Sequence, residues 1–146
     1  MTNEMRVRFT AIKENESFAR TCVASFIANY NPTIEELGDI KTAVSEAVTN
    51  CIVHAYPLET GEVEIFTSID NNNIYITVTD FGIGIDNIEQ AKQPFFTSKP
   101  DMERSGMGFT VMEGFMDSLA VKSEKGKGVK VIMTKKLGDY SIAVGG

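Results

Sequence analysis

Residues 40–56, IKTAVSEAVTNCIVHAY, are the stretch that decides the fold. Apolar side chains recur along it at helical spacing, at Ile40, Val44, Ala47, Val48 and Cys51. Just upstream, Thr33 and Glu36 have the spacing of a capping box, in which each side chain bonds the backbone N–H of the other residue. The sequence therefore predicts one long helix from Thr33 to about His54, with an apolar face turned toward a core.

Beside the apolar face, Glu46, Asn50 and His54 follow at intervals of four and line one stripe of this helix. The amide oxygen of Asn50 suits Mg²⁺, which takes few protein ligands and leaves most positions to water and phosphate. The carboxylate of Glu46 could take a proton from an attacking hydroxyl. An ordinary solvated helix face would show the same spacing, so the stripe is informative only together with other motifs.

The remaining elements are arranged around this helix. Alternating polar and apolar residues predict five strands, at residues 5–11, 62–69, 74–80, 118–124 and 129–136. Helical spacing predicts two further helices, one capped by Asn15 and ending near residue 30, the other at residues 106–116. Glycines and prolines in residues 81–105 predict an irregular flap with a short helix near 86–92. This order favours an α+β two-layer sandwich, a mixed, mostly antiparallel sheet with three helices on one face.

Composition limits the classes of protein that this chain can form. Its 146 residues, 42% of them hydrophobic, suffice for one core, so we expect a single domain at residues 1–140 and a flexible tail at 141–146. No long apolar run and no secretion leader is visible, which predicts a cytoplasmic protein without a membrane partner. Twenty acidic against fourteen basic side chains give a formal charge of −6, which disfavours direct binding of nucleic acid.

Two glycine clusters could form the two ends of a ligand site. Asp80-x-Gly82-x-Gly84 follows a strand, where the carboxylate can accept from an exocyclic amine and the glycines let a flat ring approach the backbone. A tight turn would show the same pattern. Residues 104–108, Arg-Ser-Gly-Met-Gly, precede a helix, so backbone N–H groups there could bind phosphate, with Arg104 as a charged donor. A flexible helix start is the alternative, and neither cluster matches a P-loop or a Rossmann fingerprint.

Taken in order, three boxes resemble the Bergerat-fold ATP-binding family of gyrase, Hsp90, histidine kinases and MutL. They are Glu46-x-x-x-Asn50-x-x-x-His54-Ala55-Tyr56, Asp80-x-Gly82-x-Gly84 and Gly106-x-Gly108. Within that family the chain resembles, over nearly its whole length, the short anti-sigma kinases of endospore-forming bacteria. VSEAVTNCIVHAY, AKQPFFTSKP and ERSGMGFTVME carry this likeness.

The resemblance implies an activity, cofactors and partners. The activity is that of a protein serine kinase that uses ATP and Mg²⁺, phosphorylates a small anti-anti-sigma protein and, as an ATP-bound homodimer, holds a sporulation sigma factor inactive. It also implies roles for residues. Glu46 would be the general base, Asn50 the Mg²⁺ ligand, Asp80 the acceptor from adenine, and Gly82 and Gly84 the floor of the base pocket.

The same resemblance assigns the phosphate end and the partner contact. Five residues would cradle the phosphates, namely Ser105, Gly106, Met107, Gly108 and Phe109. Arg104 would reach the terminal phosphate, Thr134 would help to fix adenine through water, and Arg20 would contact partner proteins. The chain departs from the family in that Gly106-Met107-Gly108 lacks a third glycine. The rival interpretation is an ATP-gated protein-binding module without phosphate transfer, in which ATP orders residues 93–105.

Overall fold

The computed structural model describes residues 2–56, 60–85, 92 and 108–138. The strands are β1 (Asn3–Thr10), β2 (Glu62–Asp70), β3 (Asn73–Asp80), β4 (Ser118–Glu124) and β5 (Gly128–Lys136). The helices are α1 (Asn15–Ala28), α2 (Ile34–Asn50), the π-helix η1 (Cys51–Ala55), which continues α2, and α4 (Gly108–Phe115). None of these helices is long and apolar enough to cross a membrane.

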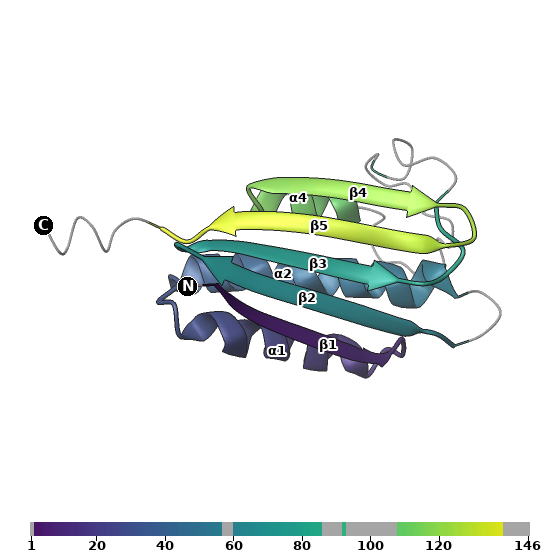
Figure 1. The fold of residues 1–146 in the computed structure, drawn as a ribbon, viewed down its shortest axis with the longest axis horizontal. Coiled ribbons are helices and arrows are strands. Elements are labelled where there is room, and N and C mark those ends of the chain that lie inside the picture. Colours follow the sequence, from purple (N-terminus) through teal and green to yellow (C-terminus); the bar gives the residue numbers. More distant parts are fainter. Residues whose placement is uncertain (1, 57–59, 86–91, 93–107, 139–146) are drawn as a thin grey trace, which may run out of the picture.

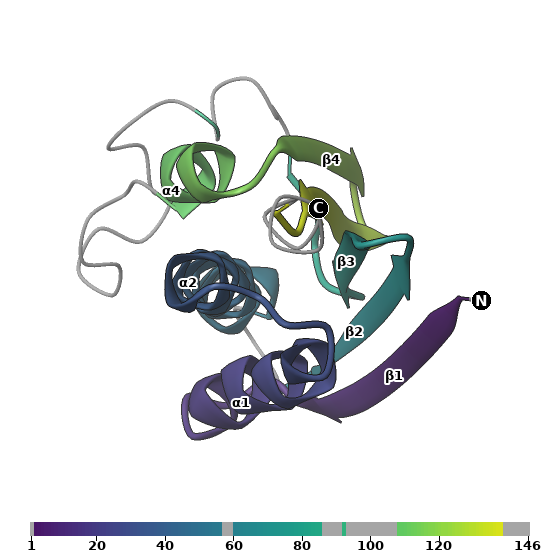
Figure 2. The same cartoon turned by 90° about the vertical axis from the view of Figure 1, so that its left-hand side faces the viewer.

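The described strands form one sheet of five in the order β1-β2-β3-β5-β4. All four of its pairings are antiparallel, so the parallel pair that a mixed sheet would contain is not among the described strands. Figure 1 shows β3 in the middle of the sheet, and Figure 2 shows α1, α2 and α4 together on one side of it. The predicted two-layer α+β class is confirmed.

Alternation along the strands decides which side chains reach the helices. On β3, Ile74, Ile76 and Val78 are fully buried, whereas Tyr75 is 44% exposed. Because side chains alternate between the two faces of a sheet, Asp80 at the end of β3 shares the helix-facing side with these apolar residues. The apolar face of α2 packs there as well, with Ile40, Val44, Ala47 and Val48 fully buried. The packing thus brings the end of β3 to the end of α2.

Local details differ from the sequence prediction at both long helices. Asn15 does not cap α1, because it is the first helical residue and its Nδ2 donates to the carbonyl of Thr10 at 2.9 Å. The second helix extends as predicted, but its last turn, Cys51–Ala55, is wound as a π-helix. Of the predicted flap at residues 81–105, the structure describes only residues 81–85 and Lys92, so its short helix near 86–92 lies outside the described residues except for Lys92, as does the tail at 141–146.

The predicted capping box at the start of α2 is confirmed. Thr33 Oγ1 accepts from the backbone N–H of Glu36 at 3.0 Å, and Glu36 Oε1 accepts from that of Thr33 at 2.8 Å. We expect Thr33→Ala to lower the free energy of unfolding by about 1 kcal/mol, the usual effect of losing such a cap. Urea unfolding measures this, with Thr33→Ser as the matched control that keeps the hydroxyl. Equal stability of the alanine and serine variants would contradict the role of the cap.

Candidate functional site

Glu46 and Asn50 lie against the first described residue of α4. A Cβ atom built on Gly108 would come within 3.1 Å of both Oδ1 and Nδ2 of Asn50 and within 3.4 Å of Oε2 of Glu46. Gly108 is buried and belongs to α4, which packs beside α2. Glycine at this position therefore lets the backbone of α4 approach the two polar side chains that sequence spacing had selected.

Asp80 is the buried acid of the site, with only 4% of the residue exposed. Its Oδ1 accepts from the backbone N–H of Gly82 at 3.0 Å and from that of Val129 at 3.2 Å. Burial raises the pKa of Asp80, and hydrogen bonds from Gly82, Val129 and the Cys51 thiol oppose this rise. The result is a carboxylate that is held in a fixed orientation at the end of β3.

The thiol of Cys51 links Asp80 to the end of α2. Cys51 is buried directly after Asn50, and its thiol lies near enough to the carboxylate of Asp80 to feel its charge. Burial and the neighbouring carboxylate raise the pKa of the Cys51 thiol, which therefore stays protonated and can donate. The N–H of Ile83 bonds the carbonyl of Ala55, and Gly108 lies against Asn50. The Asp80 loop and the one described residue of the third box are therefore both held by the segment that runs from α2 into η1.

The loop after Asp80 is wedged between two backbones. A Cβ atom on Gly82 would lie 2.1 Å from the carbonyl oxygen of Ala55, and one on Gly84 would lie 2.6 Å from that of Glu124. Gly84 also has a φ of +80°, which disfavours other residues. The backbone N–H of Ile83 donates to the carbonyl of Ala55 at 3.0 Å. Both glycines are thus required by close backbone contacts, and they fix the loop beside η1.

Thr134 is not brought to this site. It lies opposite Tyr75 of β3 and Ser118 of β4, and its hydroxyl is hydrogen-bonded to that of Ser118. Directly paired residues share a face, so Thr134 lies on the outer side of the sheet, away from the helices and from Asp80. We therefore leave Thr134 out of the site that we propose below.

The other predicted residues of the phosphate end divide into two groups. Arg104, Ser105, Gly106 and Met107 lie outside the described residues. Phe109 follows Gly108 in α4, and its side chain is part of the hydrophobic core. Among the described residues, no three His, Cys, Asp or Glu side chains converge on a metal site.

A groove of about 530 Å³ runs between α1 and α2 and reaches Glu46. It is lined by Arg20, Thr21, Gly38, Lys41, Thr42, Ser45 and Glu46. The guanidinium of Arg20 is 3.6 Å from a carboxylate oxygen of Glu16 and donates to the hydroxyl of Ser17 at 3.4 Å. The hydroxyl of Ser45 is buried without a hydrogen-bond partner. Glu46 thus borders both this groove and the contact with Gly108.

Sequence reasoning gave no role to three residues that shape the site. Cys51 counted only as an apolar position of the helix, Tyr56 only as part of a box, and Val129 only as a strand residue. The structure places them around the Asp80 loop. The N–H of Val129 donates to the carboxylate, Cys51 lies near it, and the Tyr56 hydroxyl accepts from Phe81 N–H at 2.8 Å. The only signal available was their place beside the recognised motifs.

Comparisons with known proteins find matches over most of the chain. The family described as "Histidine kinase-like ATPase domain" matches residues 9–135. A protein named anti-sigma F factor from Clostridium perfringens is 62% identical over 138 residues, which cover 94% of this chain and 99% of that protein. One with the same name from Bacillus licheniformis is 51% identical over 138 residues, 94% of each chain.

Two solved structures share the fold. The RsbU and RsbW domains of a Mycobacterium tuberculosis protein superpose with a TM-score of 0.67 at 15% identity, over 92% of this chain and 32% of that one. The catalytic domain of the histidine kinase ThkA gives a TM-score of 0.54 at 15% identity, over 91% of this chain and 97% of the other.

Proposed function

Because the chain belongs to the histidine kinase-like ATPase domain family, we propose that it is an ATP-binding anti-sigma factor that transfers the terminal phosphate of ATP to a serine of another protein. Relatives that are 51–62% identical to this chain over nearly their whole length are named anti-sigma F factor. The proposed partners are a sporulation sigma factor, which the protein holds inactive, and a small anti-anti-sigma protein, which it phosphorylates.

The observation that carries this proposal is the convergence of the three boxes. The loop after Asp80 bonds the carbonyl of Ala55 through the N–H of Ile83, and Asn50 and Glu46 lie against Gly108. A nucleotide needs a base-binding end and a phosphate-binding end within one molecule's length, and these contacts supply both along α2. The buried carboxylate suits the exocyclic amine of adenine, and the start of α4 suits phosphate.

Each residue has a proposed role in phosphate transfer. Asp80 accepts from adenine, Gly82 and Gly84 let the ring approach the loop, and Glu46 takes the proton of the acceptor serine. Asn50 fits Mg²⁺ through its amide oxygen, because that side chain lies beside the backbone of α4 where phosphates would bind. Bound Mg²⁺ would offset the negative charge of the phosphates.

The phosphates themselves would be held by the backbone of the second glycine cluster. We propose that residues 105–109 contribute N–H groups and that Arg104 stabilises the terminal phosphate. This division of labour is sufficient, because phosphoryl transfer needs positioning and charge stabilisation more than covalent chemistry.

We propose that the protein substrate binds in the groove between α1 and α2. Arg20 and Lys41 give it two positive charges, and Glu46 lies where the groove meets α4. A partner seated on Arg20 could therefore present a serine to Glu46. We further propose that the chain acts in the cytoplasm as a homodimer.

Two measurements test the proposed function. Calorimetry with Mg·ATP should give a binding signal, and incubation with ATP labelled at the γ position and a cell lysate should give a labelled protein. That label should be stable to acid treatments that remove phosphohistidine and should lie on serine. Binding of ATP without any labelled protein would favour an ATP-gated binding module, and absence of binding would refute both.

A further inference from the structure

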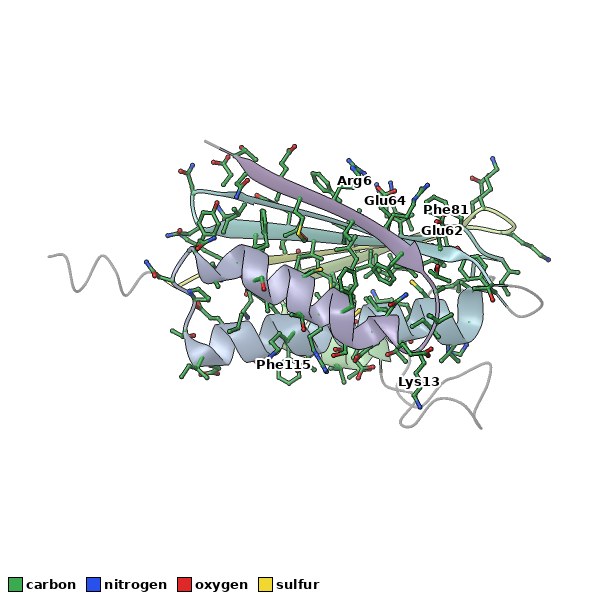
Figure 3. All side chains as sticks on the ribbon, turned by 90° about the horizontal axis from the view of Figure 1, so that it is seen from below. Arg6, Lys13, Glu62, Glu64, Phe81 and Phe115 are labelled. Atoms are coloured by element: carbon green, nitrogen blue, oxygen red, sulfur yellow. The ribbon has the colours of Figure 1, made fainter. Side chains whose placement is uncertain are left out.

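The end of β3 presents two neighbouring side chains to opposite sides of the sheet. Asp80 is buried on the helix side, whereas Phe81 is 48% exposed and lies on the outer side. Figure 3 shows Phe81 near Glu62, Glu64 and Arg6, away from the helices. The guanidinium of Arg8 lies 4.8 Å from the centroid of the Phe81 ring, a cation–π distance. The outer side therefore holds the residue next to the buried acid.

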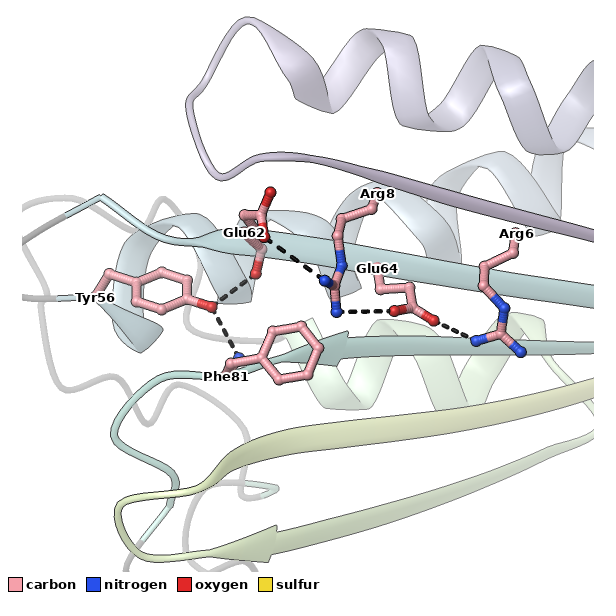
Figure 4. Close-up of polar contacts among 6 residues, drawn as sticks. All are labelled: Arg6, Arg8, Tyr56, Glu62, Glu64 and Phe81. Atoms are coloured by element: carbon pink, nitrogen blue, oxygen red, sulfur yellow. Dashed lines mark hydrogen bonds and ion pairs between the residues drawn. The ribbon is translucent and has the colours of Figure 1, made fainter.

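Arg8 is itself fixed by two carboxylates. Its Nη2 lies 3.1 Å from Oε2 of Glu64 and its Nη1 lies 3.8 Å from Oε1 of Glu62, while Arg6 pairs with the other oxygen of Glu64. Figure 4 shows these contacts as one connected set that ends at Phe81 and Tyr56. β1 and β2 thereby restrain the ring of Phe81.

Tyr56 fixes the backbone of the same residue. Its hydroxyl donates to the carbonyl of Glu62 at 2.7 Å and accepts from the N–H of Phe81 at 2.8 Å. The ring packs on the backbone of Gly61, where a Cβ atom would come within 2.1 Å of it. Burial raises the pKa of Tyr56, so the hydroxyl keeps the proton that it donates. One hydroxyl therefore joins the end of η1, the start of β2 and the end of β3.

We propose that Tyr56 is a positioning residue for the adenine-binding loop, an inference that rests on the proposed function. The paired register of β3 ends at Asp80, so the N–H of Phe81 needs a partner outside the ladder, and the Tyr56 hydroxyl is that partner. Tyr56 also directly follows Ala55, whose carbonyl accepts from Ile83 on the far side of the loop. The segment that follows Asn50 thus holds the Asp80 loop by two hydrogen bonds, one to the N–H of Phe81 and one to the N–H of Ile83.

These two hydrogen bonds fix the distance between the base end and the phosphate end of the proposed nucleotide site. Asp80 and the phosphate-side residues belong to different elements, and a freed Phe81 N–H would let the end of β3 shift relative to α2. Loss of the hydroxyl should therefore weaken recognition of the base and leave the interactions of the phosphates in place. A purely structural role would weaken both equally.

The test compares Tyr56→Phe with Tyr75→Phe, which removes the same atom from an exposed tyrosine of β3. Calorimetry gives the affinity for Mg·ATP, and competition against ATP gives that for magnesium tripolyphosphate, which has no base. We expect Tyr56→Phe to weaken ATP by about 5- to 30-fold, the equivalent of one or two lost hydrogen bonds, with tripolyphosphate changed less than about 2-fold. Tyr75→Phe should change neither.

The outcomes separate this inference from the proposed function. If the unmodified protein binds ATP and Tyr56→Phe binds it equally well, the positioning role is wrong. If Tyr56→Phe loses ATP and tripolyphosphate in equal measure, the residue has only a structural role and the inference is again overturned. Failure of the unmodified protein to bind ATP would refute the proposed function itself.

Discussion

Replacing Glu46 by alanine is expected to leave the affinity for Mg·ATP unchanged and to slow phosphate transfer by about 10²–10⁴-fold, the usual effect of losing a general base. The expectation follows from its position, because Oε2 of Glu46 lies near the start of α4 and the residue also lines the groove beside Arg20. A hydroxyl that enters from the groove would meet this carboxylate before it reached the phosphates.

The rate is measured in a single-turnover experiment as transfer of the label from ATP to the acceptor protein, and calorimetry measures the affinity for Mg·ATP. Glu35→Ala is the matched control, because Glu35 is an exposed residue of the first turn of the same helix. Its rate and affinity should stay close to those of the unmodified protein. If Glu46→Ala reduced affinity and rate by the same factor, Glu46 would be a binding residue, and the assignment as base would be wrong.

The regular elements could be predicted because their periodicity is a local property of the sequence. The alternation that predicted a strand at residues 74–80 corresponds to β3, Asn73–Asp80, and the capping box of Thr33 sets the start of α2 as expected. Both signals depend on residues that are neighbours along the chain, so tertiary packing did not override them. The two-layer class could be predicted as well, because it follows from the order of these elements along the chain.

The structure departs from the sequence analysis where a residue distant in the chain, or the face of the sheet, determines the position of a side chain. Asn15 was expected to cap α1, but the helix begins at Asn15 itself, and the Nδ2 of Asn15 donates to the carbonyl of Thr10 at the end of β1. Thr134 was assigned to the adenine site by resemblance, yet Val131 and Met133 face the core, and alternation then places Thr134 on the outer side. The alternation along this strand is visible in the sequence, so the outward position of Thr134 could have been predicted.

The meeting of the motifs could not be predicted from spacing. The bond from Ile83 to Ala55 requires η1 to lie beside the end of β3, and the bond from Val129 to Asp80 requires β5 to pair next to β3, although β4 precedes β5 in the chain. Such contacts depend on how the whole core packs, and no single motif in the sequence determines that packing. The sequence therefore selected candidate residues, and the fold decided which of them contact one another.

Replacing Asn50 by alanine is expected to weaken binding of Mg·ATP by at least about ten-fold, because in the proposed site the change removes a Mg²⁺ ligand and not only a group that orients one. Asn50 offers both polar atoms of its amide beside the backbone at Gly108, and Oε2 of Glu46 lies next to them. The loss should therefore depend on the metal. Binding of ATP in the presence of EDTA should be the same in the variant and the unmodified protein.

Calorimetry with and without Mg²⁺ measures this difference directly. Asn29→Ala is the matched control, since Asn29 is exposed at the end of α1 and should leave both affinities unchanged. Asn50→Asp adds a second comparison, because it keeps an oxygen ligand of similar size and should retain part of the metal dependence. If Asn50→Ala weakened ATP equally with and without Mg²⁺, the amide would act on the nucleotide or on the packing of α4, and the proposed Mg²⁺ ligand would have to be sought among other residues.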